Sequence, residues 1–122
     1  MKNIFLLSPA YCGGRRAAIL LKPGSRIALA QRLADGTLTL GEAFSFMSGL
    51  YFRGKLAYAG KFGTPYVITP TRGLLDPQTV VTTALLHEFA SVDVDADNRR
   101  YRRPLDRDVR KRIVPCWSVV AQ

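Results

Sequence analysis

Short apolar runs alternate with helix-like segments along the chain, and this pattern predicts strands separated by helices. Residues 3–7 form an apolar run that ends in Ser-Pro, and residues 66–69 form a β-branched run that ends in Pro, as short buried strands do. Residues 117–121 form a third run after Pro115. Because strands separated by helices pair in parallel, we predict an α/β fold: a small three-layer domain with a mainly parallel sheet and flanking helices.

Apolar residues at three- and four-residue spacings predict the helices. One helix is expected over residues 25–33 with Ser25 as its cap, and another from residue 82 or 83 to 90. A longer stripe predicts one further helix, or two helices broken near Gly49, with these residues in the core: Leu40, Phe44, Met47, Tyr51, Tyr58 and Phe62. The basic residues among them would project to solvent: Arg53, Lys55 and Lys61.

The composition is that of a basic, folded protein. The chain has 122 residues, 48% of them hydrophobic, which is enough for one domain that buries roughly two thirds of its unfolded surface. We therefore predict a single α/β domain over residues 1–122, which excludes extended disorder. Two cysteines are too few for a disulfide scaffold. Because 18 Lys and Arg residues exceed 9 Asp and Glu residues, the net charge of +9 favours an anionic partner without identifying it.

The sequence carries no membrane, signal or metal-binding pattern. No stretch approaches the about 20 apolar residues of a membrane span, and the first apolar run is too short for a signal peptide, so we predict a cytoplasmic protein. Cys12 and Cys116 would lie at opposite ends of a parallel sheet, too far apart for a disulfide. Nearby arginines could activate Cys12 as a nucleophile, although a packed cysteine is the commoner case. One histidine and no Cys-x-x-Cys spacing give no metal site, and no cofactor is expected.

Two loops that leave predicted strands form the candidate site, because open parallel sheets bind ligands beyond the carboxyl ends of their strands. Loop 8–16 offers a hydroxyl, glycine amides and two guanidinium groups, and the turn-rich loop 71–77 offers a third guanidinium, a flexible glycine and a carboxylate. We predict a cleft that binds a phosphate or a base, formed by Ser8, Gly13, Gly14, Arg15, Arg16, Arg72 and Gly73, with Asp76 as the base of a possible enzyme. The alternative is a pair of ordinary turns with solvated arginines and a capping aspartate.

The strongest charge feature is residues 99–112, which contain eight basic and two acidic residues. Pro104 suits the first turn of a helix, so a basic helix is predicted near residues 104–113. Its basic residues are candidates for contacts with a nucleic-acid backbone: Arg99, Arg100, Arg102, Arg103, Arg107, Arg110 and Lys111. The alternative is an ordinary amphipathic surface helix. Its apolar residues recur every four positions, and Asp106 and Asp108 would lie in its first turn, as the helix dipole prefers.

Three stretches resemble a bacterial protein family. Residues 48–59 read Ser-Gly-Leu-Tyr-Phe-Arg-Gly-Lys-Leu-Ala-Tyr-Ala, residues 66–77 place Gly-Leu-Leu-Asp-Pro after an apolar strand, and residues 6–10 read Leu-Leu-Ser-Pro-Ala. These motifs are similar to those of the family related to the peroxide-stress protein YaaA and, more remotely, of uracil-DNA-glycosylase-like α/β domains. The resemblance implies a three-layer fold with its cleft at the Ser8 and Gly73 loops, and a link to nucleic acids or nucleobases. It also implies further segments after the last strand, whereas this chain ends at Gln122.

Two functions stay open from the sequence. The first is a cytoplasmic α/β domain associated with nucleic acid or nucleotide, with an anion-binding cleft at the carboxyl ends of the strands and the basic helix on the nucleic-acid backbone. The second is a non-catalytic protein-interaction module, or an incomplete domain, that assembles as a homo-oligomer through an exposed sheet edge. Neither the pattern nor the resemblance decides whether the protein is an enzyme.

Overall fold

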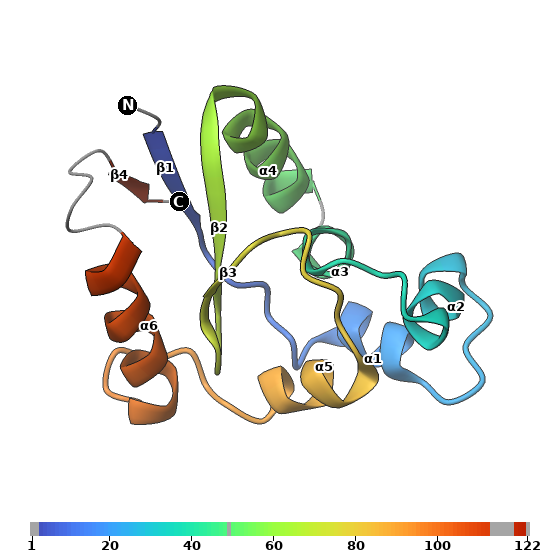
Figure 1. Cartoon of the computed structure of the whole chain (residues 1–122). Coiled ribbons are helices and arrows are strands. Elements are labelled where there is room, and N and C mark those ends of the chain that lie inside the picture. Colours follow the sequence, from blue (N-terminus) through green and yellow to red (C-terminus); the bar gives the residue numbers. More distant parts are fainter. Residues whose placement is uncertain (1–2, 49, 113–118, 122) are drawn as a thin grey trace.

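The fold is built on a four-stranded sheet with the order β3-β2-β1-β4 (Figure 1). The structure is a computed structural model that describes residues 3–48, 50–112 and 119–121. The strands are β1 (Asn3–Leu7), β2 (Gly63–Thr69), β3 (Gly73–Leu75) and β4 (Val119–Ala121). Strand β1 pairs in parallel with both β2 and β4, as the alternation of strands and helices predicts. The α/β class is therefore confirmed.

Strand β3 makes the sheet mixed rather than mainly parallel, which corrects the prediction. It lies antiparallel to β2, in a segment predicted to be a loop. Only residues 70–72 separate the two strands, and a connection this short can join antiparallel neighbours but never parallel ones. Thr69 holds the turn, because its Oγ1 accepts a hydrogen bond from the Arg72 backbone nitrogen at 2.9 Å and donates one to the Gly73 carbonyl at 2.9 Å.

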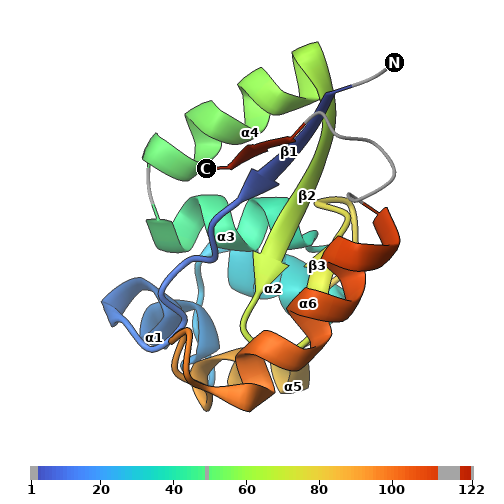
Figure 2. The ribbon, with the colours of Figure 1, turned by 90° about the vertical axis from the view of Figure 1, so that its left-hand side faces the viewer.

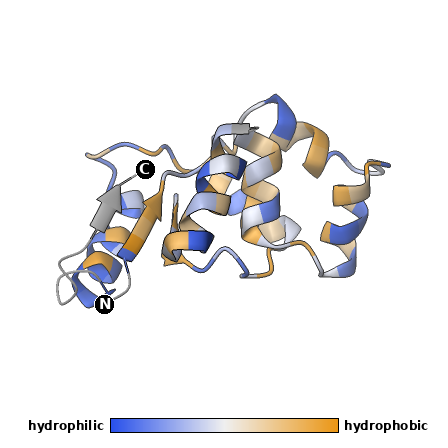
Figure 3. Ribbon diagram, turned by 90° about the horizontal axis from the view of Figure 1, so that it is seen from above, coloured by the Kyte–Doolittle hydropathy of each residue, from blue (hydrophilic) through white to orange (hydrophobic). Residues whose placement is uncertain are grey.

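The described helices carry both hydrophobic and hydrophilic residues, as helices with one face on a core do (Figure 3). Helix α5 begins where the sequence predicts, with the Thr82 hydroxyl accepting a hydrogen bond from the Leu85 nitrogen at 3.1 Å. Helix α2 begins later than predicted, with Ile27 rather than Ser25 at its N-cap. The helices are α1 (Arg15–Leu21), α2 (Ala28–Asp35), α3 (Leu40–Ser48), α4 (Leu50–Phe62), α5 (Thr83–Ala90) and α6 (Arg99–Arg112).

The predicted apolar stripe is divided between α3 and α4, and only its first half lies in the core. Phe44 is fully buried, whereas Tyr51, Tyr58 and Phe62 are exposed and Phe52 takes their place in the core. Helices α3 and α4 are separate, and the packing of each helix decides which of its faces is buried. The apolar spacing of α3 therefore does not predict the buried face of α4. The basic residues of α4 are exposed, as predicted.

Alternate residues of β1 face two different clusters. Phe5 and Leu7 belong to the larger cluster, together with buried residues of α1 to α5. Ile4 and Leu6 belong to the smaller cluster on the other face, with residues of β3 and α6. Figure 2 shows α6 on one side of the strands and α3 and α4 on the other. Because α6 packs chiefly beside β3, the complete three-layer arrangement stays a prediction.

An electrostatic link joins α2 to the first turn of α3. Glu42 and Thr39 form a capping box: the Glu42 nitrogen donates to Thr39 Oγ1 at 3.2 Å, and the Thr39 nitrogen donates to Glu42 Oε1 at 3.1 Å. The Arg32 guanidinium of α2 pairs with the same carboxylate, with Nη2 at 2.8 Å from Oε1. The hydrogen bond from Arg32 and those from Thr39 outweigh partial burial and lower the pKa of Glu42 to about 2.

Candidate anion-binding site

Helix α6 begins at Arg99 rather than near Pro104, so Pro104 lies inside the helix and not in its first turn. Asn98 starts the helix, since its Oδ1 accepts from the Arg100 nitrogen at 3.0 Å and its carbonyl accepts from the Arg102 nitrogen at 2.9 Å. The earlier start adds more than one turn of arginine-rich helix. The last predicted residue of the helix, Ile113, lies outside the described residues.

The inner side of α6 is fastened to β3 by a buried carboxylate. Asp108 is 8% exposed, and its Oδ2 accepts a hydrogen bond from the Leu74 nitrogen at 3.0 Å. Burial would raise the pKa of Asp108, but the hydrogen bonds from Arg107 and Leu74 outweigh it and keep the pKa below its ordinary value. Asp108 was predicted to lie in the first turn of its helix. The true start places it near the carboxyl end, where β3 holds it instead of the helix dipole.

Gly73 lies directly beneath α6 instead of lining an open loop. Its φ is +66°, a left-handed conformation that favours glycine. A Cβ at this position would approach the Pro104 carbonyl oxygen to 2.6 Å and collide with the Asp108 carboxylate. Gly73 therefore lets the helix approach the sheet, and it is too buried to contact a ligand.

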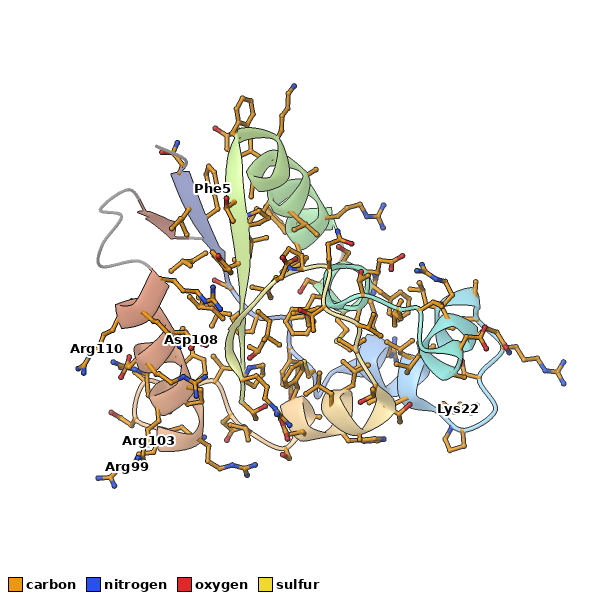
Figure 4. All side chains as sticks on the ribbon, in the orientation of Figure 1. Phe5, Lys22, Arg99, Arg103, Asp108 and Arg110 are labelled. Atoms are coloured by element: carbon orange, nitrogen blue, oxygen red, sulfur yellow. The ribbon has the colours of Figure 1, made fainter. Side chains whose placement is uncertain are left out.

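The first turns of α6, the β2–β3 turn and α5 line a cavity of about 580 Å³, here called the arginine cavity. Residues 99, 103 and 107 recur at four-residue spacings, so their side chains lie on one face of the helix. Figure 4 shows Arg99, Arg103 and Arg110 extending away from the sheet, while Asp108 points toward it. The cavity is lined by Thr71, Arg72, Glu88, Arg99, Arg100, Arg103, Pro104 and Arg107.

Glu88 is the one carboxylate that lines this cavity among the described residues. Both of its oxygens bind Arg72, with Nε at 2.8 Å from Oε2 and Nη2 at 2.9 Å from Oε1, and Thr71 Oγ1 donates to the same group. The hydrogen bonds from Arg72 and Thr71 lower the pKa of Glu88, and the positive charge of Arg100 adds to them. Arg72, a predicted anion ligand, is thus held by a protein carboxylate.

Three of the cavity arginines form no ion pair within the described part of the chain: Arg99, Arg100 and Arg103. Arg107 pairs with Asp108, its Nε lying 2.9 Å from Oδ1. Arg102 pairs with Asp106 at 3.2 Å and does not line the cavity. Arg110 and Lys111 are exposed beyond it. The cavity therefore collects an excess of positive charge with unoccupied hydrogen-bond donors.

A second cavity, of about 550 Å³, lies at the carboxyl ends of β1 and β2 and is here called the strand-end cavity. Ser8 and Gly13 line it, as predicted for a cleft at this edge. Its walls combine polar and apolar surface and include the rings of Tyr11 and Tyr101 as well as Asp93. Burial raises the pKa of Tyr101, so its phenol stays protonated near neutral pH.

The two cavities share a wall. At three places one residue lines the arginine cavity and its chain neighbour lines the strand-end cavity: Thr71 and Pro70, Glu88 and Phe89, Arg100 and Tyr101. Neither Glu88 nor Tyr101 is a predicted site residue. Both come to this end of the sheet through the packing of α5 and α6, which no local spacing in the sequence reveals.

The remaining predicted site residues lie elsewhere. Arg16 donates a hydrogen bond to the Phe46 carbonyl of α3 at 3.1 Å. Gly14 and Arg15 line neither of the two cavities, and Arg15 is exposed. Asp76 is exposed and accepts a hydrogen bond from the Gln78 nitrogen at 2.8 Å, as a turn cap does. Because β3 reverses the chain, Asp76 is carried away from the carboxyl ends of β1 and β2.

Cys12 is a packed thiol. It is 4% exposed, and burial raises its pKa to about 12, so it stays protonated and is no nucleophile near neutral pH. Cys116, which was predicted to lie too far from Cys12 for a disulfide, is outside the described residues. Over residues 3–48, 50–112 and 119–121, no His, Cys, Asp and Glu side chains gather as a metal site would require. The described helices include none with the length and apolar character of a membrane span.

Comparisons with protein-family models, with curated proteins and with solved structures found no significant match to this chain. The candidate site is therefore interpreted from its own residues.

Proposed function

We propose that this protein binds nucleic acid or nucleotides, and that the arginine cavity takes their phosphate groups. The observation that carries the proposal is the cluster formed by Arg99, Arg100 and Arg103, which form no salt bridge among the described residues. Guanidinium groups bind phosphate through paired, charge-assisted hydrogen bonds, which are stronger than those between neutral groups. An excess of such groups on one helix face is typical of a surface for a phosphate backbone.

Glu88 and Arg72 set the boundary of the phosphate site. Their ion pair orders Arg72 along the cavity wall, and the carboxylate repels an anion that approaches this wall. Phosphate is therefore directed toward the unpaired arginines at the beginning of α6. Phosphates further along a polynucleotide would reach Arg110 and Lys111, which are exposed beyond the cavity.

The strand-end cavity suits the part of a nucleotide that carries no charge. Apolar side chains make up about half of its walls, and Tyr11 and Tyr101 supply aromatic surface beside the arginine cavity. A base or sugar placed there would keep its phosphate within reach of the shared wall at Arg100. We propose binding without a catalytic step, because Asp76 lines neither cavity.

A salt titration tests the proposal. Fluorescence anisotropy would follow binding to labelled single- and double-stranded DNA and RNA between about 50 and 200 mM salt. Each phosphate contact contributes about 0.9 to the slope of log affinity against log salt concentration on duplex DNA, so contacts to three arginines predict a slope near −2.7 or steeper. No binding at the lowest salt concentration would refute the proposal.

A further inference from the structure

Helix α4 presents a row of largely exposed aromatic rings beside the face that it packs on the core. Tyr51 is 83% exposed, Tyr58 57% and Phe62 52%. Spacings of seven and four residues place the three rings on one side of the helix, together with Lys55. We call these four residues the α4 stripe. Helix α4 packs on the opposite sheet face from α6, so the stripe is separate from the arginine cavity (Figure 1).

The rings at the end of the stripe are held in place by other rings. Tyr58 contacts Phe5 of β1 edge-on, with ring centroids 5.8 Å apart, and Phe62 lies 4.6 Å from Tyr58. The backbone beneath them is anchored by Phe52 and Ala59, which are buried on the adjacent face of the helix. Exposed rings that are already ordered lose little conformational entropy on binding a ligand.

Every charged residue of α4 is basic. Lys55 Nζ lies 6.0 Å from the Tyr51 ring centroid, and Lys61 Nζ lies 5.5 Å from the Phe62 ring centroid. Arg53 is the third basic residue, and the helix contains no Asp or Glu. The charge therefore favours an anionic occupant. Pairing of two α4 stripes from two copies of the chain would oppose like charges, so it argues against self-association through this face.

We infer that the α4 stripe binds single-stranded nucleic acid, with bases stacking on Tyr51 and Phe62 and phosphates pairing with Lys55 and Lys61. Aromatic rings interleaved with basic side chains are the arrangement that binds unpaired bases regardless of sequence. A duplex does not offer the faces of its bases, which are stacked on one another. The exposed large hydrophobic side chains that the structure describes on α4 are all aromatic, so each offers a flat face on which a base can stack.

The inference goes beyond the proposed function, because it assigns a second surface and a preference for single strands. Removal of one stacking ring is expected to weaken binding by about 5- to 150-fold. The test compares labelled oligothymidylate with a duplex hairpin of equal length, using the full chain. Tyr51→Leu alters a side chain that is 83% exposed, so the variant is expected to fold. Tyr51→Leu/Phe62→Leu removes both flat surfaces while keeping apolar side chains.

The expected result is a loss of at least about fivefold in affinity for oligothymidylate with Tyr51→Leu, a larger loss with the double variant, and unchanged affinity for the hairpin. Ile19→Ala/Val80→Ala is the control, since it removes exposed apolar side chains from other elements and should change neither affinity. Unchanged oligothymidylate affinity in both stripe variants would overturn the inference.

Three further measurements separate this inference from other occupants and from the proposed function. Binding of the wild type to phosphatidylserine vesicles that is abolished by Tyr51→Leu, while oligothymidylate binding is kept, would assign the stripe to lipid and overturn the inference. A dimer mass that reverts to monomer in the same variant would assign it to a second copy. Arg99→Gln/Arg103→Gln should weaken hairpin binding and leave the effect of Tyr51→Leu on oligothymidylate affinity unchanged. The proposed function of the arginine cavity and the inference about the α4 stripe can therefore be refuted separately.

Discussion

The Asp108 carboxylate accepts a hydrogen bond from the Leu74 backbone nitrogen at 3.0 Å, and this bond joins the arginine helix to the edge strand of the sheet. The bond is buried, and it lies beside Gly73, whose conformation makes room for the helix. The same carboxylate binds Arg107 at 2.9 Å, so one buried group fixes α6 and one of its arginines. The arginine cavity depends on this attachment.

Loss of the Asp108 carboxylate is expected to destabilise the fold. In Asp108→Ala the Leu74 nitrogen is left buried without an acceptor, which costs about 1–3 kcal/mol of unfolding free energy. Asp108→Asn keeps an oxygen that can accept the bond and should cost less. Urea denaturation measures both values. Equal stability of Asp108→Ala and the wild type would show that the bond does not hold α6 in place.

Gly73 is expected to tolerate no side chain. Gly73→Ala forces a Cβ into a left-handed residue and against Pro104, so unfolding free energy should fall by more than about 1 kcal/mol. Gly54 is the matched control, because it lies in α4 with no atom within 4 Å of an added Cβ. Gly54→Ala should raise stability by about 0.5–1 kcal/mol through helix propensity. If both substitutions shifted the melting temperature in the same direction, the close approach of α6 to Gly73 would not explain the need for glycine there.

Acid is expected to weaken the fold through three paired carboxylates: Glu42, Glu88 and Asp108. Each has a folded-state pKa below its ordinary value, so each contributes stability that is present above the ordinary pKa and lost as pH falls through the folded pKa. For Glu42 this window runs from about 4.5 down to about 2. The urea midpoint should fall across this window, and Glu42→Gln should reduce the dependence. A midpoint that is independent of pH below 4.5 would be inconsistent with these pairs.

Cys12 is expected to resist alkylation in the folded state. With its pKa raised to about 12 and only 4% of its surface exposed, hardly any thiolate is present near neutral pH. Mass spectrometry after iodoacetamide treatment of a Cys116→Ser variant should find adduct only when urea is added. Rapid labelling without urea would mean that the β1–α1 loop opens.

Local signals predicted much of the fold, and long-range contacts account for most of the errors. Strand β1 and helix α5 were predicted from a continuous apolar run and from helical apolar spacing, both of which act within a few residues. Strand β3 was missed because its pairing with β2 is what makes it a strand, and three residues carry little pattern of their own. The early start of α6 was missed because the sequence pattern places Pro104 in the first turn of the helix, whereas the structure starts the helix at the Asn98 cap.

The sequence predicted the place of only some residues of the candidate site, because the others depend on long-range contacts. The parallel pairing of β1 and β2 brings Ser8 and Gly13 to the expected edge, which follows from the order of strands and helices. Asp76 and Gly73 were misplaced because the reversal at β3 turns both away from that edge. The contact between Arg72 and Glu88 joins residues 16 positions apart through tertiary packing, which no local spacing reveals.

The central claim, that the arginine face of α6 binds nucleic-acid phosphate, is tested most directly by two variants of equal charge. Arg99→Gln/Arg103→Gln and Lys22→Gln/Arg26→Gln each remove two exposed positive charges, and the second pair belongs to the α1–α2 connection. Figure 4 shows Lys22 on the other side of the molecule from Arg99 and Arg103. Duplex affinity is measured for both against salt concentration. We predict that the α6 variant binds more weakly, with a salt slope shallower by about 2, and that the control keeps the wild-type slope. Equal losses in the two variants would contradict the claim, because the attraction would then come from net charge alone.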